Sequence, residues 1–249
     1  MSTARLNDSL FLSDLHLQPG EPATWAHARL VLHEAARQGL NLYILGDLFE
    51  QWVGDDAMEE FDREVADTLL QCSRQVAVFL QHGNRDFLLG EVFCQASGAR
   101  LLDDPYRVDS DAGPTLLSHG DAWCTDDAAY QTVRRQVRDP AWQQAMLSQP
   151  VEARRALARQ AREQSKNHQY QLEETLLDVN PQAVEQAFVQ HDVIHIIHGH
   201  THRPNVHRHP AANQNRTRWV LGDWRPQARI LLYRQGRFQP LDSHEFLSD

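Results

Sequence analysis

Apolar runs alternate with helix-like segments through the first hundred residues of the chain. Runs of three to five consecutive apolar residues, each followed by polar residues, predict strands at 9–14, 41–47 and 75–84. Apolar residues at helical spacing predict helices from Pro22 to Gly39, over 62–73 and around 87–97. Strands that alternate with helices are typical of crossover units, so we expect an α/β fold with a largely parallel sheet.

The second half of the chain has a different pattern. Apolar runs predict strands at 114–121 and 192–200, and antiparallel closing strands at 219–224 and 228–234. Residues 126–172 are polar and rich in Ala, Gln and Arg, with Pro140 and Pro150 as breaks, and they predict two or three helices. A further helix is expected near Pro181. We therefore expect a core formed by residues 1–125 and 173–249, with residues 126–172 inserted as a helical cap.

Composition narrows the class of protein. A chain of 249 residues with 41% apolar residues suits one large globular domain carrying an insertion. Three widely spaced cysteines predict no disulfide framework and favour reduced thiols. No apolar run reaches the roughly 18 residues of a membrane span, and the start MSTARLND lacks the apolar region of a secretion signal. We expect a cytoplasmic protein.

Charge is distributed unevenly along the chain. The net charge of −10 argues against nucleic acid as a partner. Residues 128–170, however, carry eight basic and three acidic side chains, a local net charge of +5. A basic island in an acidic protein predicts an anionic partner at that place, although a solvated helix face has the same composition.

Polar clusters follow the ends of the predicted strands. They are DLH at 14–16, GD at 46–47, GNRD at 83–86, HGD at 119–121 and HGHTH at 198–202. The carboxyl ends of strands in open α/β sheets are where ligands bind. Each cluster alone is equally typical of a helix cap or a turn. Together they predict one ligand site.

The residue types in these clusters point to metal binding. The candidate ligands combine carboxylate, amide and imidazole groups, and they are Asp14, His16, Asp47, Asn84, His119, His200 and His202. This set suits divalent first-row metals, and the lack of a thiol argues against a structural zinc site. Seven ligands exceed what one tetrahedral ion uses, so we expect two ions bridged by a carboxylate. Alternate residues of an extended loop point the same way, which would turn His200 and His202 toward the metals and leave His198 out of the ligand set.

The five clusters, in this order, resemble the motifs of the calcineurin-like metallophosphoesterases. The resemblance runs from residue 14 to residue 202 and implies an αββα sandwich of two mixed β-sheets flanked by helices. The longer stretches FLSDLHL, YILGDLFEQWVGDD, HGNRDFL, HGDAWCTDDAAYQ and IHGHTHRP are similar to the UDP-2,3-diacylglucosamine hydrolases of lipid A biosynthesis.

That second resemblance implies an activity. Those enzymes hydrolyse the pyrophosphate of UDP-2,3-diacylglucosamine to UMP and 2,3-diacylglucosamine 1-phosphate, by water attack on the α-phosphorus, usually with Mn²⁺. It also implies a peripheral protein on the cytoplasmic face of the inner membrane, in contact with the anionic membrane surface. Apolar stripes at 141–147 and 151–157 suit acyl chains, although packing on the core requires such stripes as well.

The family's site residues carry over by position. The first metal would be held by Asp14, His16, Asp47 and His202, and the second by Asp47, Asn84, His119 and His200, with Asp47 bridging. Asn84, Arg85 and His200 are the implied catalytic and phosphate-contacting residues, and an ion pair with Asp86 is the alternative for Arg85. Asp127 and Ser165 match substrate contacts in the cap. The family's Asn or Thr and its Lys are replaced here by Gln169 and Leu172, and Lys166 is the only lysine of the chain.

Other functions share the same motifs. A dinucleoside polyphosphate or cyclic nucleotide hydrolase would use the same metal centre, and a non-catalytic scaffold could use the same fold. A structural or loop-shaping role, without a physical account from the sequence, is expected for Trp52, Asp55, Asp56, Asp223 and Trp224.

Overall fold

The computed structural model describes residues 5–169, 178–210, 215–224 and 228–248, and the side chains of 166–169 are not described. Its strands are β1 (Ser9–Leu12), β2 (Asn41–Leu45), β3 (Val78–Gln81), β4 (Arg100–Leu101), β5 (Tyr106–Val108), β6 (Thr115–Leu117), β7 (His195–His198), β8 (Asn205–His209), β9 (Arg216–Val220), β10 (Arg229–Arg234) and β11 (Arg237–Asp242). Its α-helices are α1 (Pro22–Arg37), α2 (Glu60–Ser73), α3 (Glu91–Ser97), α4 (Ala128–Val137), α5 (Pro140–Leu147), α6 (Val151–Gln169), α7 (Pro181–Gln190) and α8 (Ser243–Ser248).

The first sheet has the order β11-β10-β1-β2-β3-β4. Strands β1 to β4 are parallel, and helices α1, α2 and α3 provide the crossovers between them. Strand β10 runs antiparallel to both β1 and β11. The predicted parallel half and the antiparallel closing strand over 228–234 are therefore confirmed.

The second sheet has the order β5-β6-β7-β9-β8. Strand β9 is parallel to β7 and antiparallel to β8, so the antiparallel pairing expected for a strand over 219–224 is present on one side only, and the strand ends at Val220. The reason is that β8 continues to the edge of the sheet and β9 returns between β8 and β7. The polar sequence of β8, NVHRH, has no apolar run, and β4 has only two residues, so neither strand was predicted.

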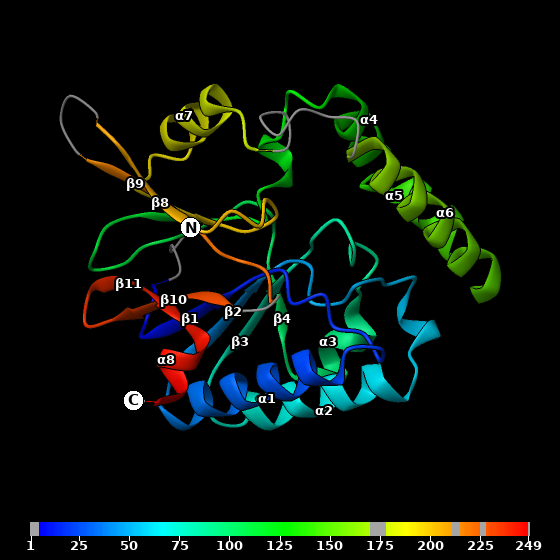
Figure 1. The fold of residues 1–249 in the computed structure, drawn as a ribbon, viewed down its shortest axis with the longest axis horizontal. Coiled ribbons are helices and arrows are strands. Elements are labelled where there is room, and N and C mark those ends of the chain that lie inside the picture. Colours follow the sequence, from blue (N-terminus) through cyan, green and yellow to red (C-terminus); the bar gives the residue numbers. More distant parts are fainter. Residues whose placement is uncertain (1–4, 170–177, 211–214, 225–227, 249) are drawn as a thin grey trace.

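Alternating side chains of the strands produce the layers of the fold (Figure 1). Leu10 and Ile44 point to the helical side of the first sheet, into a core shared with α1 and α2. Phe11 and Tyr43, one residue away in each strand, pack between the two sheets against Ile197. The outer face of the second sheet packs on α7 in a third cluster. The layers are therefore helices, sheet, sheet and helix, which confirms the expected αββα sandwich.

Helices α4, α5 and α6 follow β6 and precede α7, and they lie together at one side of the sandwich (Figure 1). We call these helices the insertion. Their basic residues bind carboxylates of the chain itself: Arg134 and Arg138 pair with Asp121, Arg154 with Asp56, Arg155 with Glu59 and Arg162 with Glu50. Five of the eight basic residues of the basic island thus form ion pairs with carboxylates outside the insertion.

Asp55 and Asp56, two of the residues expected to be structural, connect the loop after β2 to other parts of the chain. The Asp55 carboxylate accepts hydrogen bonds from Trp52 Nε1 at 3.1 Å and from the backbone N–H groups of Gly90 and Phe93 at the start of α3. Its neighbour Asp56 binds the guanidinium of Arg154, whose side chain is only 1% exposed.

None of the described helices combines the length and the apolar composition that crossing a membrane requires.

Candidate metal centre

The seven candidate ligands lie at the carboxyl ends of five strands. Asp14 and His16 follow β1, Asp47 follows β2, and Asn84 follows β3; His119 follows β6, and His200 and His202 follow β7. Because β1 to β3 belong to one sheet and β6 and β7 to the other, both sheets contribute to the same site. The structure therefore brings all seven predicted residues together.

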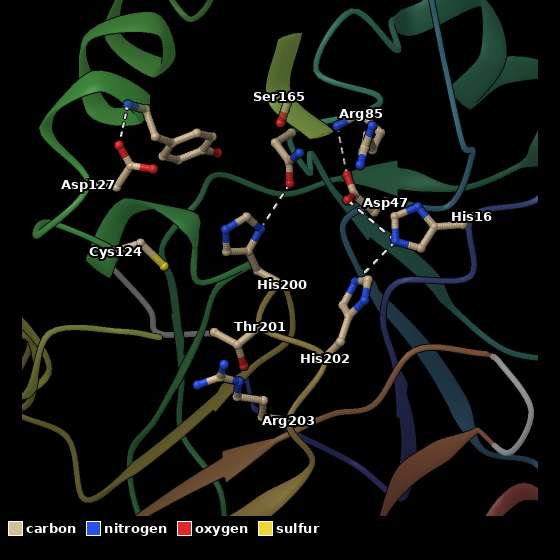
Figure 2. A pocket seen from close by; sticks show the side chains of 12 residues that line it. His16, Asp47, Arg85, Cys124, Asp127, Ser165, His200, Thr201, His202 and Arg203 are labelled. Carbon is tan, nitrogen blue, oxygen red and sulfur yellow. Dashed lines mark hydrogen bonds and ion pairs between the residues drawn. The ribbon is translucent and has the colours of Figure 1, made fainter. Parts of the chain in front are cut away.

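Two overlapping groups of ligand atoms can be distinguished. In one group, atoms of Asp14, His16 and His202 lie within 4.8 Å of one another; in the other, atoms of Asp14, Asp47 and His119 do. Figure 2 shows His16, His202 and Asp47 pointing toward one another, with His16 Nε2 3.2 Å from His202 Nε2 and 3.8 Å from Asp47 Oδ2.

On the second side, Asn84 Oδ1 lies 3.1 Å from His119 Nε2 and 2.9 Å from His200 Nδ1. His119 Nε2 is also 3.8 Å from Asp47 Oδ2. Asp47 thus lies between the two halves of the site, since the same oxygen faces His16 on one side and His119 on the other.

The backbone at the site is unusual. Five of the seven candidate ligands have left-handed backbone conformations: φ is 55° at Asp14, 49° at His16, 54° at Asp47, 68° at His200 and 53° at His202. Such conformations cost of order 1 kcal/mol or more for a residue with a side chain and concentrate at functional sites. His200 and His202 do face the same site, but the expectation of an extended backbone was wrong, because both histidines are left-handed.

Close packing of the site loops leaves room only for glycine at several positions, of which 83 and 199 are the most crowded. A Cβ at Gly83 would lie 2.0 Å from Asp47 Oδ1, and a Cβ at Gly199 would lie 1.7 Å from Ser13 Oγ. The GNRD and HGH clusters therefore contain glycine because the carboxylate and serine side chains of neighbouring loops occupy that space.

The electrostatics of the site favour cations. Asp14 and Asp47 are buried, and within the described ranges every ion-pair partner of their carboxylates is a histidine. Burial raises the pKa of Asp47. Burial also opposes ionisation of His119, but the charges of Asp47 and Asp14 outweigh it and raise the pKa of His119 to about 9. Buried carboxylates need a compensating charge, and the mixed oxygen and imidazole donors fit divalent cations.

Carboxylates outside the candidate ligand set support two of the histidines. His16 Nδ1 lies 2.9 Å from Glu50 Oε2, and His202 Nδ1 lies 3.7 Å from Asp223 Oδ2. A carboxylate at the second ring nitrogen is the usual way to orient a metal-binding histidine. Sequence reasoning missed both; Glu50 lies within the GDLFE motif, whereas Asp223 carries no such signal.

His198 lies behind the site. Its Nδ1 is 2.9 Å from the Gly199 carbonyl oxygen, its Nε2 is 3.1 Å from Arg218 Nη1, and its ring meets Trp123 edge to face. Burial, together with the charge of Arg218, lowers the pKa of His198 to about 3. This histidine is a neutral packing residue.

Asp86 and Arg85 do not pair with each other among the described contacts. The Asp86 carboxylate accepts hydrogen bonds from the backbone N–H groups of Leu48 and Gly83, both at 2.7 Å, and so joins two site loops. Arg85 lines the cavity, and the described part of the chain offers no hydrogen-bond partner to its buried Nε.

A cavity of about 240 Å³ opens over the candidate ligands. Residues of the insertion and its junction line one side of it, namely Cys124, Asp127, Tyr130 and Ser165, and Thr201 and Arg203 line another. Sequence reasoning expected Asp127 and Ser165 here and missed the other four. Asp127 accepts a hydrogen bond from the Tyr130 backbone N–H at 2.8 Å and caps α4. Gln169 ends α6, and Leu172 lies outside the described residues.

Comparison with known proteins identifies the family. The profile of the calcineurin-like phosphoesterases matches residues 9–204. UDP-2,3-diacylglucosamine hydrolase of Stenotrophomonas maltophilia (strain K279a) is 46% identical over 231 residues, which cover 90% of this chain and 93% of that protein. The protein of the same name from Xanthomonas campestris pv. campestris (strain ATCC 33913) is also 46% identical, over 90% of this chain and 94% of its own length.

Among solved structures, that of an archaeal phosphodiesterase is similar at a TM-score of 0.46 and 11% identity, covering 94% of this chain and 99% of its own. Calcineurin-like phosphoesterases use divalent metal ions, which the donor groups at this site fit. The chain belongs to the calcineurin-like phosphoesterase family and, within it, to the family of the UDP-2,3-diacylglucosamine hydrolases.

Proposed function

We propose that this protein hydrolyses the pyrophosphate of UDP-2,3-diacylglucosamine to UMP and 2,3-diacylglucosamine 1-phosphate. The observation that carries the proposal is the position of Asp47 Oδ2 between His16 on one side and His119 on the other, beneath a cavity lined partly by a helical insertion. The 46% identity to hydrolases named for this substrate supports the choice of diphosphate.

Two divalent cations, Mn²⁺ by preference, are proposed to occupy the site. Asp14, His16, Asp47 and His202 would hold one, and Asp47, Asn84, His119 and His200 the other. The combination of carboxylate, amide and imidazole donors without thiolate supports Mn²⁺ over softer metals. When bound, two such ions supply Lewis acidity and make water a nucleophile at neutral pH.

The protein's own groups then orient the substrate. Water attacks the phosphorus nearer uridine, and the bond from that phosphorus to the bridging oxygen breaks, so that the second phosphate departs with the sugar. Arg85 is suited to bind the phosphate oxygens because its guanidinium reaches the cavity and can take two oxygens at once. The leaving group is itself a phosphate, which needs little help from a general acid. Asn84 and His200 line the same cavity and are proposed to contact the phosphate as well.

The cap predicted over residues 126–172, to which the insertion belongs, is proposed to act as a lid over the lipid. Ser165 and Asp127 line the cavity and would contact the substrate, and Gln169 and Leu172 remain predicted contacts. Val133, Leu147 and Leu157 are apolar side chains of the insertion that stay 41–54% exposed. Exposed apolar residues on the insertion support a role in holding acyl chains, and in peripheral contact with the cytoplasmic face of the inner membrane.

The test is product analysis in isotopically labelled water. The purified protein is incubated with Mn²⁺ and UDP-2,3-diacylglucosamine in H₂¹⁸O, and the products are analysed by mass spectrometry. UMP carrying the label is the expected result, and Asp47→Ala serves as the control without turnover. Label in 2,3-diacylglucosamine 1-phosphate instead would contradict the proposal that water attacks the phosphorus nearer uridine. Cleavage of an aryl phosphodiester without cleavage of the lipid would contradict the substrate and leave the metal centre in place.

A further inference from the structure

One metal-side histidine is connected to the insertion through a buried carboxylate. His16 Nδ1 lies 2.9 Å from Glu50 Oε2, and the other oxygen of Glu50, Oε1, forms an ion pair with Arg162 of α6. The side chains of His16 and Glu50 are only 8% and 7% exposed, and that of Arg162 is 27% exposed. Glu50 therefore contacts the candidate metal site with one oxygen and the insertion with the other.

The two nitrogens of His16 have different surroundings. Nε2 faces the centre, 3.8 Å from Asp47 Oδ2 and 3.9 Å from Asp14 Oδ1. A neutral imidazole that gives the Nε2 lone pair to a cation carries its proton on Nδ1. Glu50 Oε2 lies 2.9 Å from that nitrogen, an ion-pair contact without hydrogen-bond geometry in this structure, and is near enough to accept the proton once the ring and the carboxylate align. Glu50 thus suits a role in fixing both the tautomer and the ring orientation of His16.

Arg162 lies on the face of α6 that looks toward the cavity. Ser165, three residues further along the same helix, lines the cavity, and residues three apart share a helix face. The same side of α6 therefore reaches the substrate space and the carboxylate behind His16.

We propose that Glu50 is a positioning residue for the metal held by His16 and that Arg162 couples the insertion to that metal through Glu50. The insertion then contributes to assembly of the metal site as well as covering it. This inference rests on the proposed metal site but is independent of which diphosphate is cleaved.

A second arginine of the same helix provides a matched control. Arg155 pairs with Glu59, whose side chain is 58% exposed and which contacts none of the candidate ligands among the described interactions. Arg155→Ala and Arg162→Ala each remove one guanidinium from α6 and one ion pair to the core. Only the second change disturbs the carboxylate next to His16.

The experiment measures Mn²⁺ binding alone to the full-length, metal-stripped protein, with equilibrium dialysis and free Mn²⁺ read by electron paramagnetic resonance. The wild type should bind two ions. Glu50→Ala should weaken the binding of one ion about 10- to 100-fold, as loss of a carboxylate behind a metal-binding histidine does. The affinity for the other ion should stay unchanged. Glu50→Gln keeps an oxygen for Nδ1 and should lose less Mn²⁺ affinity. This variant replaces Glu50→Ala in the comparison if the alanine variant does not fold.

Arg162→Ala should weaken the binding of the same ion about two- to fivefold, which is the scale of a partly exposed ion pair. In a protein that already carries Glu50→Ala, it should not lower the Mn²⁺ affinity further. Arg155→Ala should bind both ions as the wild type does. Unchanged binding in Glu50→Ala or in Arg162→Ala, equal weakening of both ions, or equal effects of the two arginine variants would overturn the inference. A wild type that binds two ions without cleaving the lipid would contradict the proposed substrate and leave these comparisons valid.

Discussion

The Asp47 carboxylate fills the space beside Gly83. A Cβ at position 83 would lie 2.0 Å from Asp47 Oδ1 and 2.3 Å from the Asp47 backbone nitrogen, so the two loops fit together only with glycine there. Since Asp47 lies between the two halves of the candidate metal centre, the absence of one side chain at residue 83 positions the shared carboxylate.

Gly83→Ala should therefore displace Asp47 and weaken binding of both ions, by at least the roughly 10- to 100-fold that loss of a supporting residue costs. Mn²⁺ content after dialysis is the measurement. Gly20→Ala is the control, because a Cβ there meets nothing within 4 Å. Full metal content in Gly83→Ala would show that the loops can separate without loss of the site.

Arg85→Lys should lower kcat/KM about 100-fold, a typical effect of losing one preorganised donor at the reacting group. The ammonium of lysine cannot take two phosphate oxygens side by side as a guanidinium does. Steady-state kinetics are the measurement, with bound Mn²⁺ expected to stay at the wild-type level. Arg135→Lys, at an exposed position of α4, is the control. A kcat/KM in Arg85→Lys equal to that of the wild type would remove Arg85 from the phosphate site.

Asp56→Asn should lower the free energy of unfolding by about 0.5–1 kcal/mol, because the guanidinium of Arg154 loses an ionised partner that is itself 60% exposed and therefore screened by solvent. The hydrogen bond from Arg154 holds the pKa of Asp56 below its ordinary value. A depressed carboxyl pKa stabilises the fold above the pKa of the unfolded chain, and this contribution is lost as pH falls through the lower, folded value.

The difference in unfolding free energy between wild type and Asp56→Asn, measured with urea, should therefore be full at pH 7 and shrink below about pH 4. Asp67→Asn, at an exposed position of α2, is the matched control and should show little difference at either pH. A difference that stays constant down to pH 3 would contradict the role of the ionised Asp56.

Metal removal should destabilise the whole sandwich, since the buried Asp14 and Asp47 then lose the cations that compensate their charge. A ligand that binds the folded state and not the unfolded state raises the free energy of unfolding by about 2.7 kcal/mol when its free concentration is 100 times the dissociation constant. Calorimetry should show a lower Tm after chelation and full recovery on adding Mn²⁺. A Tm that does not respond to either step would argue against a bound metal in the folded protein.

Much of the fold and of the candidate site follows from local pattern. The apolar runs of β1, β2 and β3 and the helices between them predict parallel crossover strands, and parallel strands bring their carboxyl ends to one edge. That is why the sequence alone predicts that Asp14, Asp47 and Asn84 meet. Strand β8 could not be found in the same way, because its polar sequence is typical of an edge strand that buries little.

Other features depend on contacts between segments that are distant in the chain. The sequence by itself determined the ligand types and the basic charge of the insertion, because both are properties of residues within short stretches. Only the tertiary structure decided that Arg162 meets Glu50. It also decided that Arg154 meets Asp56, which lies 98 positions before it in the chain. The left-handed backbone at His200 and His202 also belongs to the tertiary structure, since packed neighbouring loops maintain a local conformation that these residues disfavour on their own.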